Sequence, residues 1–233
     1  MEEFWEILLG IRKASDEAGI RIVTGDTKVV ERGKGDKIFI NTSGIGRLHP
    51  AANIHANRVL PGDKSLVSGP GAQHGVAILS VRQGLEFETT VVSDTRPLWE
   101  PVSDLLDKLG NDVHFLRDPT RGGVATVLNE LAQQAKVGVE IVQQSIPVSE
   151  QVEGACEMLG LDPLYVANEG IFIVVVPASR EEEALSILKK FNAHAASIGE
   201  MVDSHARQVI LHSRIGGKRI VTMLPGEQLP RIC

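Results

Sequence analysis

The chain has 233 residues, a length suited to one large domain or two small ones. Its 42% hydrophobic and 23% charged residues exclude a wholly disordered or collagen-like chain, because that composition suffices for a packed core. A formal net charge of -6 with 4% aromatic residues argues against nucleic acid as the main partner, since phosphates attract cations and bases stack on aromatic rings. The longest apolar run, residues 171–176, is far shorter than the ~20 residues of a membrane-spanning helix.

The first 60 residues predict one helix and one hairpin. Apolar residues at helical spacing predict a helix over residues 2–18, and Gly19 can end it in the left-handed conformation. Residues 20–23 and 37–41 predict two short strands, which the glycine-rich run between them joins as a hairpin. We assign residues 1–60 to the remnant of a first domain.

Residues 61–223 alternate strands with helices, a pattern typical of a complete α/β domain. Strands are predicted over residues 65–68, 113–116, 139–142, 171–176, 196–202, 208–212 and 219–223. Helices are predicted from within the glycine-rich loop 69–75 to residue 84, over 97–109, from residue 123 to about 136, over 149–159 and over 179–191.

The last residue, Cys233, stands at the end of a segment that predicts a mobile tail, because residues 224–233 carry two prolines and no periodicity. A thiol there is either incidental or a swinging group carrier, and Arg231 favours its thiolate form. Cys156 lies in a predicted helix, where we expect a small buried hydrophobe. Two cysteines are too few for a disulfide framework, and no secretory signal is visible, so we expect a cytoplasmic protein.

Two loops combine residue types that bind anions or activate amides. Asp118 to Gly123 places an arginine and two glycines at a helix start, where bare backbone amides suit a phosphate or carboxylate. A closely packed glycine turn is the alternative. Asp26, Thr27 and Lys28 offer a carboxylate, a hydroxyl and an ammonium after a strand, without the spacing of a P-loop. A solvated hairpin turn is the alternative there.

Glu169 precedes the most apolar strand of the chain, where burial can raise the pKa of a carboxyl group and make it a general base. The alternative is a polar strand entrance. His74 is predicted either to contact a ligand or to cap a helix. The seven histidines show no metal-ligand spacing, so we predict no metal site within the protein.

Four motifs taken together resemble one family over the whole chain. They are GDTKVV at residues 25–30, DPTRGG at 118–123, ANEG at 167–170 and the terminal PRIC at 230–233. The family is HypE, a group of hydrogenase maturation factors that are carbamoyl dehydratases, similar in fold to aminoimidazole ribonucleotide synthetase and selenophosphate synthetase. The resemblance implies a two-domain α/β fold with a truncated first domain, in which residues 1–60 are the remnant of an ATP-binding and dimerisation domain. It also implies a complete α/β second domain, residues 61–223, and a flexible C-terminal tail.

The resemblance also implies a reaction. The carbamoyltransferase HypF carbamoylates Cys233, ATP activates the amide oxygen, and loss of water leaves a thiocyanate. The cyanide then passes to the HypC–HypD complex for the iron of [NiFe]-hydrogenase. Lys28 and Glu169 join Cys233 as catalytic residues, and the cofactors are ATP and Mg²⁺. The residues implied for cofactor binding are Asp26, Thr27, Asp118 and Arg121.

Two other functions compete with this one. Members of the family carry a further N-terminal segment, with acidic residues for ATP and Mg²⁺ and the strands that form a homodimer. The chain without such residues could be a catalytically incomplete fragment that acts as a binding module for maturation partners. A sister synthetase that activates a free small molecule is the other alternative, but such an enzyme needs no terminal carrier thiol.

Overall fold

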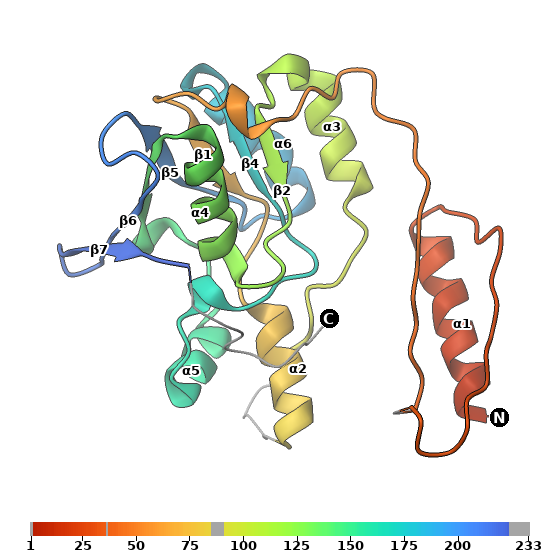
Figure 1. The fold of residues 1–233 in the computed structure, drawn as a ribbon. Coiled ribbons are helices and arrows are strands. Elements are labelled where there is room, and N and C mark those ends of the chain that lie inside the picture. Colours follow the sequence, from red (N-terminus) through yellow and green to blue (C-terminus); the bar gives the residue numbers. More distant parts are fainter. Residues whose placement is uncertain (1, 36, 85–90, 224–233) are drawn as a thin grey trace. The chain divides into compact units, whose positions relative to one another are not determined.

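The computed structural model describes residues 2–35, 37–84 and 91–223 (Figure 1). The chain divides into two compact units, one within residues 1–48 and one within residues 49–233. The predicted tail at residues 224–233, with Cys233, lies outside the described residues. Among those that are described, no helix is both long and apolar enough to cross a bilayer.

The first unit contains the predicted helix, α1 (Glu2–Glu17). Its half-buried positions recur at helical spacing, at Phe4, Ile7 and Ile11, so one stripe packs and the rest faces solvent. Two acidic residues in the first turn, Glu2 and Glu3, complement the helix dipole.

The predicted strands at residues 20–23 and 37–41 are wrong, and so is their hairpin. Neither segment is in a strand, although the turn between them is present, with Lys34 N donating to Glu31 O at 3.0 Å. The apolar side chains that suggested strands are exposed, Val23 at 87% and Phe39 at 77%. Two strands without a third, and without an apolar face to cover, are marginal in water.

The second unit is built on one seven-stranded sheet of order β2-β4-β1-β5-β3-β6-β7 (Figure 1). Every neighbouring pair is antiparallel except β3 and β6, which are parallel. The strands are β1 (Lys64–Val67), β2 (Phe115–Arg117), β3 (Gly138–Val142), β4 (Ile173–Val176), β5 (Ala196–Val202), β6 (Val209–His212) and β7 (Lys218–Val221). All seven strands predicted in residues 61–223 are therefore confirmed.

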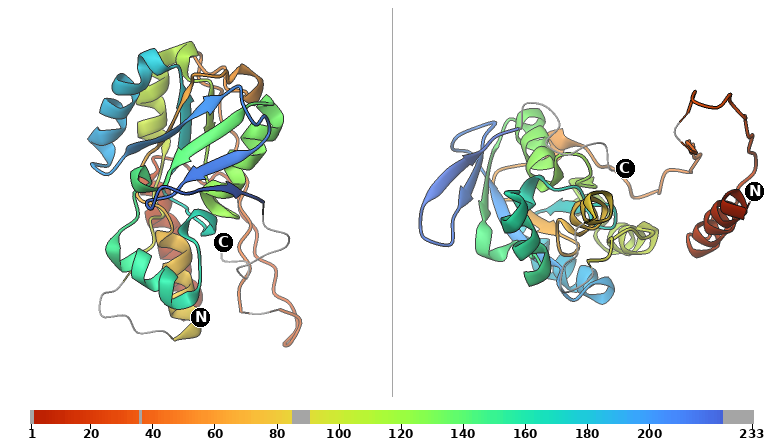
Figure 2. Two further views of the ribbon diagram at one scale, coloured as in Figure 1. Left: turned by 90° about the vertical axis from the view of Figure 1, so that its left-hand side faces the viewer. Right: turned by 90° about the horizontal axis from the view of Figure 1, so that it is seen from below.

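Helices cover both faces of this sheet (Figure 2). They are α2 (Gln73–Gln83), α3 (Trp99–Leu109), α4 (Gly123–Ala135), α5 (Glu150–Leu159) and α6 (Glu181–Phe191), which confirms the five predicted helices. Short 3-10 turns lie between these elements or before β1, at Ala56–Arg58, Gly110–Asp112, Gln143–Ser145, Pro163–Tyr165 and Ala178–Arg180. The predicted α/β fold is confirmed.

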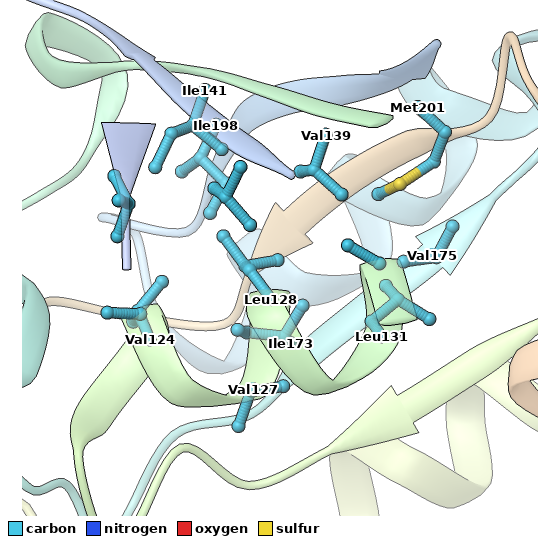
Figure 3. Close-up of a cluster of buried hydrophobic side chains, with 14 of the residues drawn as sticks. Val124, Val127, Leu128, Leu131, Val139, Ile141, Ile173, Val175, Ile198 and Met201 are labelled. Atoms are coloured by element: carbon cyan, nitrogen blue, oxygen red, sulfur yellow. The ribbon is translucent and has the colours of Figure 1, made fainter. Parts of the chain in front are cut away.

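Two apolar clusters hold the layers together. On one face α4 packs Leu128 and Leu131 against Ile173 and Met201 of the sheet, all at most 1% exposed (Figure 3). On the other face α3 and α6 pack against β1 and β4. Since β4 is buried on both faces, all four of its residues are apolar, which explains the continuous apolar run in the sequence.

The remaining helices, α2 and α5, pack against each other beyond one end of the sheet (Figures 1 and 2). Cys156 on α5 is 1% exposed in this cluster, as predicted for a small buried hydrophobe. Burial, followed by the charges of Asp162 and Glu153, raises the pKa of its thiol to about 11. A neutral thiol of this kind is a packing residue and not a nucleophile.

Candidate functional site

The sheet topology brings three of the predicted loops to one edge. Strands β1 and β2 both pair antiparallel to β4, on its two sides. The carboxyl ends of β1 and β2 therefore lie beside the amino end of β4. The loops that meet there are residues 68–72, 118–122 and 167–172.

Asn168 ties the three loops together. It is fully buried, and its side-chain Oδ1 accepts a hydrogen bond from Ala72 N at 2.6 Å. Its Nδ2 donates to Pro119 O at 2.9 Å and to Val166 O at 3.0 Å. One side chain thus joins the start of α2, the loop before α4 and the strand entrance that carries Glu169. We did not single out Asn168 in the sequence analysis, where it was only a neighbour of Glu169.

The helices after β1 and β2 approach this strand entrance closely, and glycines allow it. Gly123 opens α4 with φ +60°, and a Cβ there would lie 2.5 Å from Leu164 O and 2.7 Å from Val166 O. Gly75 in α2 donates its N–H to Ala167 O at 3.0 Å, and a Cβ there would lie 2.4 Å from a Val166 methyl group. Both helix N-termini are therefore held against the segment that carries the candidate base. The amides of Gly75 and Gly123 are paired, with Ala167 O and Thr120 O, so what each helix start offers an anion is the positive end of its dipole.

A fourth segment, which the sequence analysis missed, holds the backbone at Glu169. Asp94 Oδ1 accepts a hydrogen bond from Glu169 N at 3.2 Å, and Asp94 Oδ2 accepts one from Gly170 N at 3.0 Å. Arg96 Nε donates to Gly170 O at 2.8 Å. The signal in the sequence was a cluster of polar residues, Ser93 to Arg96, ended by a proline.

His74 also contacts this segment. It is 7% exposed, and its Nδ1 lies 2.8 Å from Ser93 Oγ. The hydroxyl of Ser93 in turn lies 2.7 Å from Thr95 Oγ1. His74 therefore links the first turn of α2 to residues 93–96, and whether it also contacts a ligand stays a prediction.

Glu169 has the electrostatic character expected of a general base. Burial raises the pKa of its carboxyl group, the charge of His74 lowers it, and the charges of Asp94 and Asp118 raise it again, with a net upward shift. The predicted direction is thus confirmed. Its Oε1 is buried and has no hydrogen-bond partner among the described residues. An oxygen in that state can accept a proton from a substrate at little competing cost.

The other predicted site residues fall into two groups. Asp118 and Arg121 are exposed in the loop before α4, in the same loop cluster as Glu169. Asp26, Thr27 and Lys28 are exposed in the first unit, where Asp26 Oδ1 accepts a hydrogen bond from Thr27 N at 2.9 Å.

The described residues contain no group of three His, Cys, Asp or Glu side chains arranged to hold a metal ion. For an anion the loop cluster offers two helix N-termini and the exposed Arg121, and the same cluster contains the carboxylate oxygen Glu169 Oε1, which is unpaired among the described residues. This arrangement suits a reaction that releases a phosphate while a proton is removed nearby.

The fold and this loop cluster place the chain in a known class. Residues 61–212 match the C-terminal domain of AIR synthase related proteins, and residues 1–48 match their N-terminal domain. The chain is therefore an AIR synthase related protein.

Within this class the similarity is to hydrogenase maturation proteins. The chain is 48% identical over 229 residues to carbamoyl dehydratase HypE of Azotobacter vinelandii, covering 97% of the chain and 67% of that protein. It is 41% identical to carbamoyl dehydratase HypE of Escherichia coli K12, covering 100% of the chain and 69% of the relative. The chain belongs to the HypE family of hydrogenase maturation proteins, and it spans about two thirds of the length of these relatives.

Solved structures agree with this assignment. A crystal structure of HypE in complex with ATP shares 48% identity at a TM-score of 0.90, covering 95% of the chain and 68% of the other. A crystal structure of a HypE–HypF complex shares 44% identity at a TM-score of 0.91, covering 96% and 73%.

Proposed function

We propose that the chain catalyses the ATP-dependent dehydration of an S-carbamoyl group on Cys233 to a thiocyanate, which supplies the cyanide ligands of [NiFe]-hydrogenase iron. The observation that carries this proposal is Glu169: its carboxyl pKa is raised, its Oε1 is unpaired among the described residues, and two helix N-termini lie in the same loop cluster. Relatives named carbamoyl dehydratase support the reaction class.

The chemistry requires an activated oxygen and a base. The amide oxygen of the thiocarbamate attacks the γ-phosphorus of ATP, ADP leaves, and one of the two N–H protons passes to solvent, which gives an imidate phosphate with a single N–H. Glu169 then takes the remaining proton from nitrogen, the nitrogen lone pair forms the C≡N bond, and the C–O bond breaks with loss of inorganic phosphate. The oxygen of the lost water thus departs on phosphate. The N-termini of α2 and α4, with Arg121, stabilise the negative charge of the leaving group.

The remaining candidate residues would bind the nucleotide. In the first unit we propose Lys28 as a cation for the phosphates, with Asp26 and Thr27 next to it in the chain. In the second unit, taken by itself, we propose Asp118 and Arg121 of the loop cluster as phosphate-binding residues. A HypE relative binds ATP in its crystal structure, which supports a nucleotide site in this family. We include Mg²⁺ only as the counter-ion that accompanies ATP. The described residues do not fit a protein-held metal site, so no step is assigned to the ion.

The partners follow from the same scheme. We propose that HypF donates the carbamoyl group, supported by the crystal structure of a HypE–HypF complex, and that the HypC–HypD complex accepts the cyanide. We propose residues 1–60 as the remnant of an ATP-binding and dimerisation domain, residues 61–223 as the domain that carries the loop cluster, and residues 224–233 as the tail that carries the thiol. A cytoplasmic location keeps Cys233 a free thiol.

The proposal is tested by intact mass spectrometry in two steps. The chain is first carbamoylated by HypF with carbamoyl phosphate and ATP, then desalted and given fresh ATP. We expect the second step to remove the mass of one water from the carbamoylated chain, and Glu169→Gln to block that loss while leaving carbamoylation unchanged. Cys233→Ser should accept no carbamoyl group. A carbamoylated wild-type chain that never loses water would refute the proposal.

The alternative is a binding module that docks maturation partners without ATP chemistry. It is favoured by two observations on the described residues: none forms a metal-holding cluster, and residues 20–48 contain no strand. Calorimetric titration with Mg-ATP separates the two functions. Saturable binding that Lys28→Ala weakens supports the enzyme, and no measurable heat together with intact binding to HypF supports the module.

A further inference from the structure

The peptide that carries the candidate base is held from outside its own loop. Asp94 lies 75 residues before Glu169 in the sequence, yet its two carboxylate oxygens accept the N–H groups of Glu169 and Gly170. Arg96, two residues further on, donates to the carbonyl of Gly170. Two consecutive residues, 169 and 170, are thus fixed by one carboxylate and one guanidinium.

Gly170 shows how tight this contact is. A Cβ on Gly170 would lie 1.6 Å from the backbone oxygen of Asp94 and 3.2 Å from a side-chain carbon of Arg96. The close approach brings the Asp94 carboxylate onto the backbone amides and not onto the side chain of Glu169. The Oε1 of Glu169 has no hydrogen-bond partner among the described residues, whereas the main chain that bears it is held by two hydrogen bonds to Asp94.

We propose that Asp94 is a positioning residue for Glu169, fixing through its two backbone hydrogen bonds the direction in which the base meets the carbamoyl nitrogen. This inference rests on the proposed function, because it assumes that Glu169 removes the proton. A base on a mobile peptide meets its substrate in a productive orientation less often than a base on a fixed one. A displacement of the base by about 1 Å can lower the rate by about 100-fold. The carboxylate of Asp94 has a second effect, since its charge raises the pKa of Glu169.

Two variants separate these effects. Asp94→Ala removes both hydrogen bonds and the charge. Asp94→Asn removes the charge and keeps one acceptor oxygen. In the place of Oδ2 that oxygen can accept from both amides, because Oδ2 lies 3.3 Å from Glu169 N and 3.0 Å from Gly170 N. Asp203→Ala, an exposed residue in the turn between β5 and β6, is the matched control. The rate of ATP-dependent water loss from the carbamoylated full chain is measured by mass spectrometry across a range of pH, with thermal melting of each variant beside it.

The expected result has three parts. Asp94→Ala lowers the dehydration rate by roughly 10–100-fold at saturating ATP, Asp94→Asn retains most of the rate, and Asp203→Ala is unchanged. In Asp94→Asn the acidic limb of the pH profile moves to lower pH, because one negative charge beside Glu169 is gone. His74 and Asp118 also face Glu169 and stay in place in these variants. Carbamoylation of Cys233 stays constant, since it occurs in the active site of HypF.

The outcomes distinguish the inference from the proposed function. If Glu169→Gln loses water at the wild-type rate, the proposed base is wrong. If Glu169→Gln is blocked but Asp94→Ala dehydrates normally, the base stands and the positioning role of Asp94 is overturned. Equal losses in Asp94→Ala and Asp94→Asn with an unmoved acidic limb would reduce Asp94 to a structural residue. Should Asp94→Ala fail to fold, the rate and pH limb of Asp94→Asn decide.

Discussion

Replacing Asn168 by alanine tests how the loop cluster is held together. The change deletes three side-chain hydrogen bonds and leaves Ala72 N and Val166 O without that partner, while Pro119 O keeps the backbone N–H of residue 168 at 3.2 Å. Each buried group left unpaired costs about 1–3 kcal/mol. Because a water molecule can replace part of the lost side chain, we take about 1 kcal/mol for each of the two unpaired groups and about 1 kcal/mol for the third lost hydrogen bond, a total of about 3 kcal/mol.

The measurement is urea unfolding followed by circular dichroism. At an m-value of about 2 kcal/mol/M, a loss of about 3 kcal/mol lowers the midpoint by about 1.5 M. Asn168→Asp should lose at least as much, because it places a carboxylate against two carbonyl oxygens. The control is Asn111→Ala, at an exposed asparagine, for which we expect a change within about 0.5 kcal/mol. A midpoint for Asn168→Ala equal to that of Asn111→Ala would show that this side chain does not join the loops.

Three more measurements address neighbouring features. Gly123→Ala should lower the free energy of unfolding by about 2–4 kcal/mol, because the backbone has a positive φ and the new Cβ would overlap Leu164 O. Gly154→Ala in α5, with nothing near its Cβ, should raise that free energy by about 0.5–1 kcal/mol. Urea midpoints that move in the same direction in both variants would contradict this. Cys156 should resist iodoacetamide at about pH 8 in the folded chain and react after unfolding, because its pKa is about 11 and it is buried; peptide mass mapping checks this, and rapid labelling of the folded chain would show an accessible thiolate. Glu169→Gln should raise the thermal midpoint at neutral pH. The pKa of the Glu169 carboxyl group is raised in the folded state, so the free energy of unfolding falls as pH rises through that pKa. Glutamine does not titrate and therefore avoids this loss of stability. The gain should vanish below the ordinary range of glutamate, near pH 4, and a gain that is independent of pH would exclude this origin.

The elements of the second unit could be predicted from the sequence because each depends on a local pattern. The apolar run before Pro177 predicts β4, and the periodicity of residues 179–191 predicts α6. Strand order could not be predicted, since β1 lies between β4 and β5, which come more than 100 residues later in the chain. The predicted hairpin at residues 20–41 was wrong because a local pattern alone does not make a strand; a strand also needs a partner. Its local pattern is that of strands, but the described residues provide no further strand to pair with it.

Within the site, too, residues with a local signal could be predicted and residues that act through distant contacts could not. Glu169 was found because a residue that directly precedes a buried apolar strand is itself expected to be partly buried, and burial raises the pKa of a carboxyl group. Asn168 and Asp94 act on groups that are distant in sequence, and their roles depend on pairings that only the folded chain provides: Asn168 bonds Ala72, 96 residues away, and Asp94 bonds Glu169 across 75.

The hydrogen bonds around the base show how the fold tolerates a destabilising residue. An ionised carboxylate with a buried, unpaired oxygen weakens the folded state, and pairing that oxygen would relieve the cost but also occupy the lone pair that must take the proton. The structure places its hydrogen bonds on the backbone around Glu169 instead, from Asn168 on one side and Asp94 on the other. The two kinds of substitution should therefore have opposite effects on stability. Changing Glu169 to glutamine stabilises the chain and stops dehydration, whereas removing Asn168 destabilises it. If both changes lowered stability by similar amounts, the carboxylate would be a structural group and the assignment of Glu169 as the base would fail.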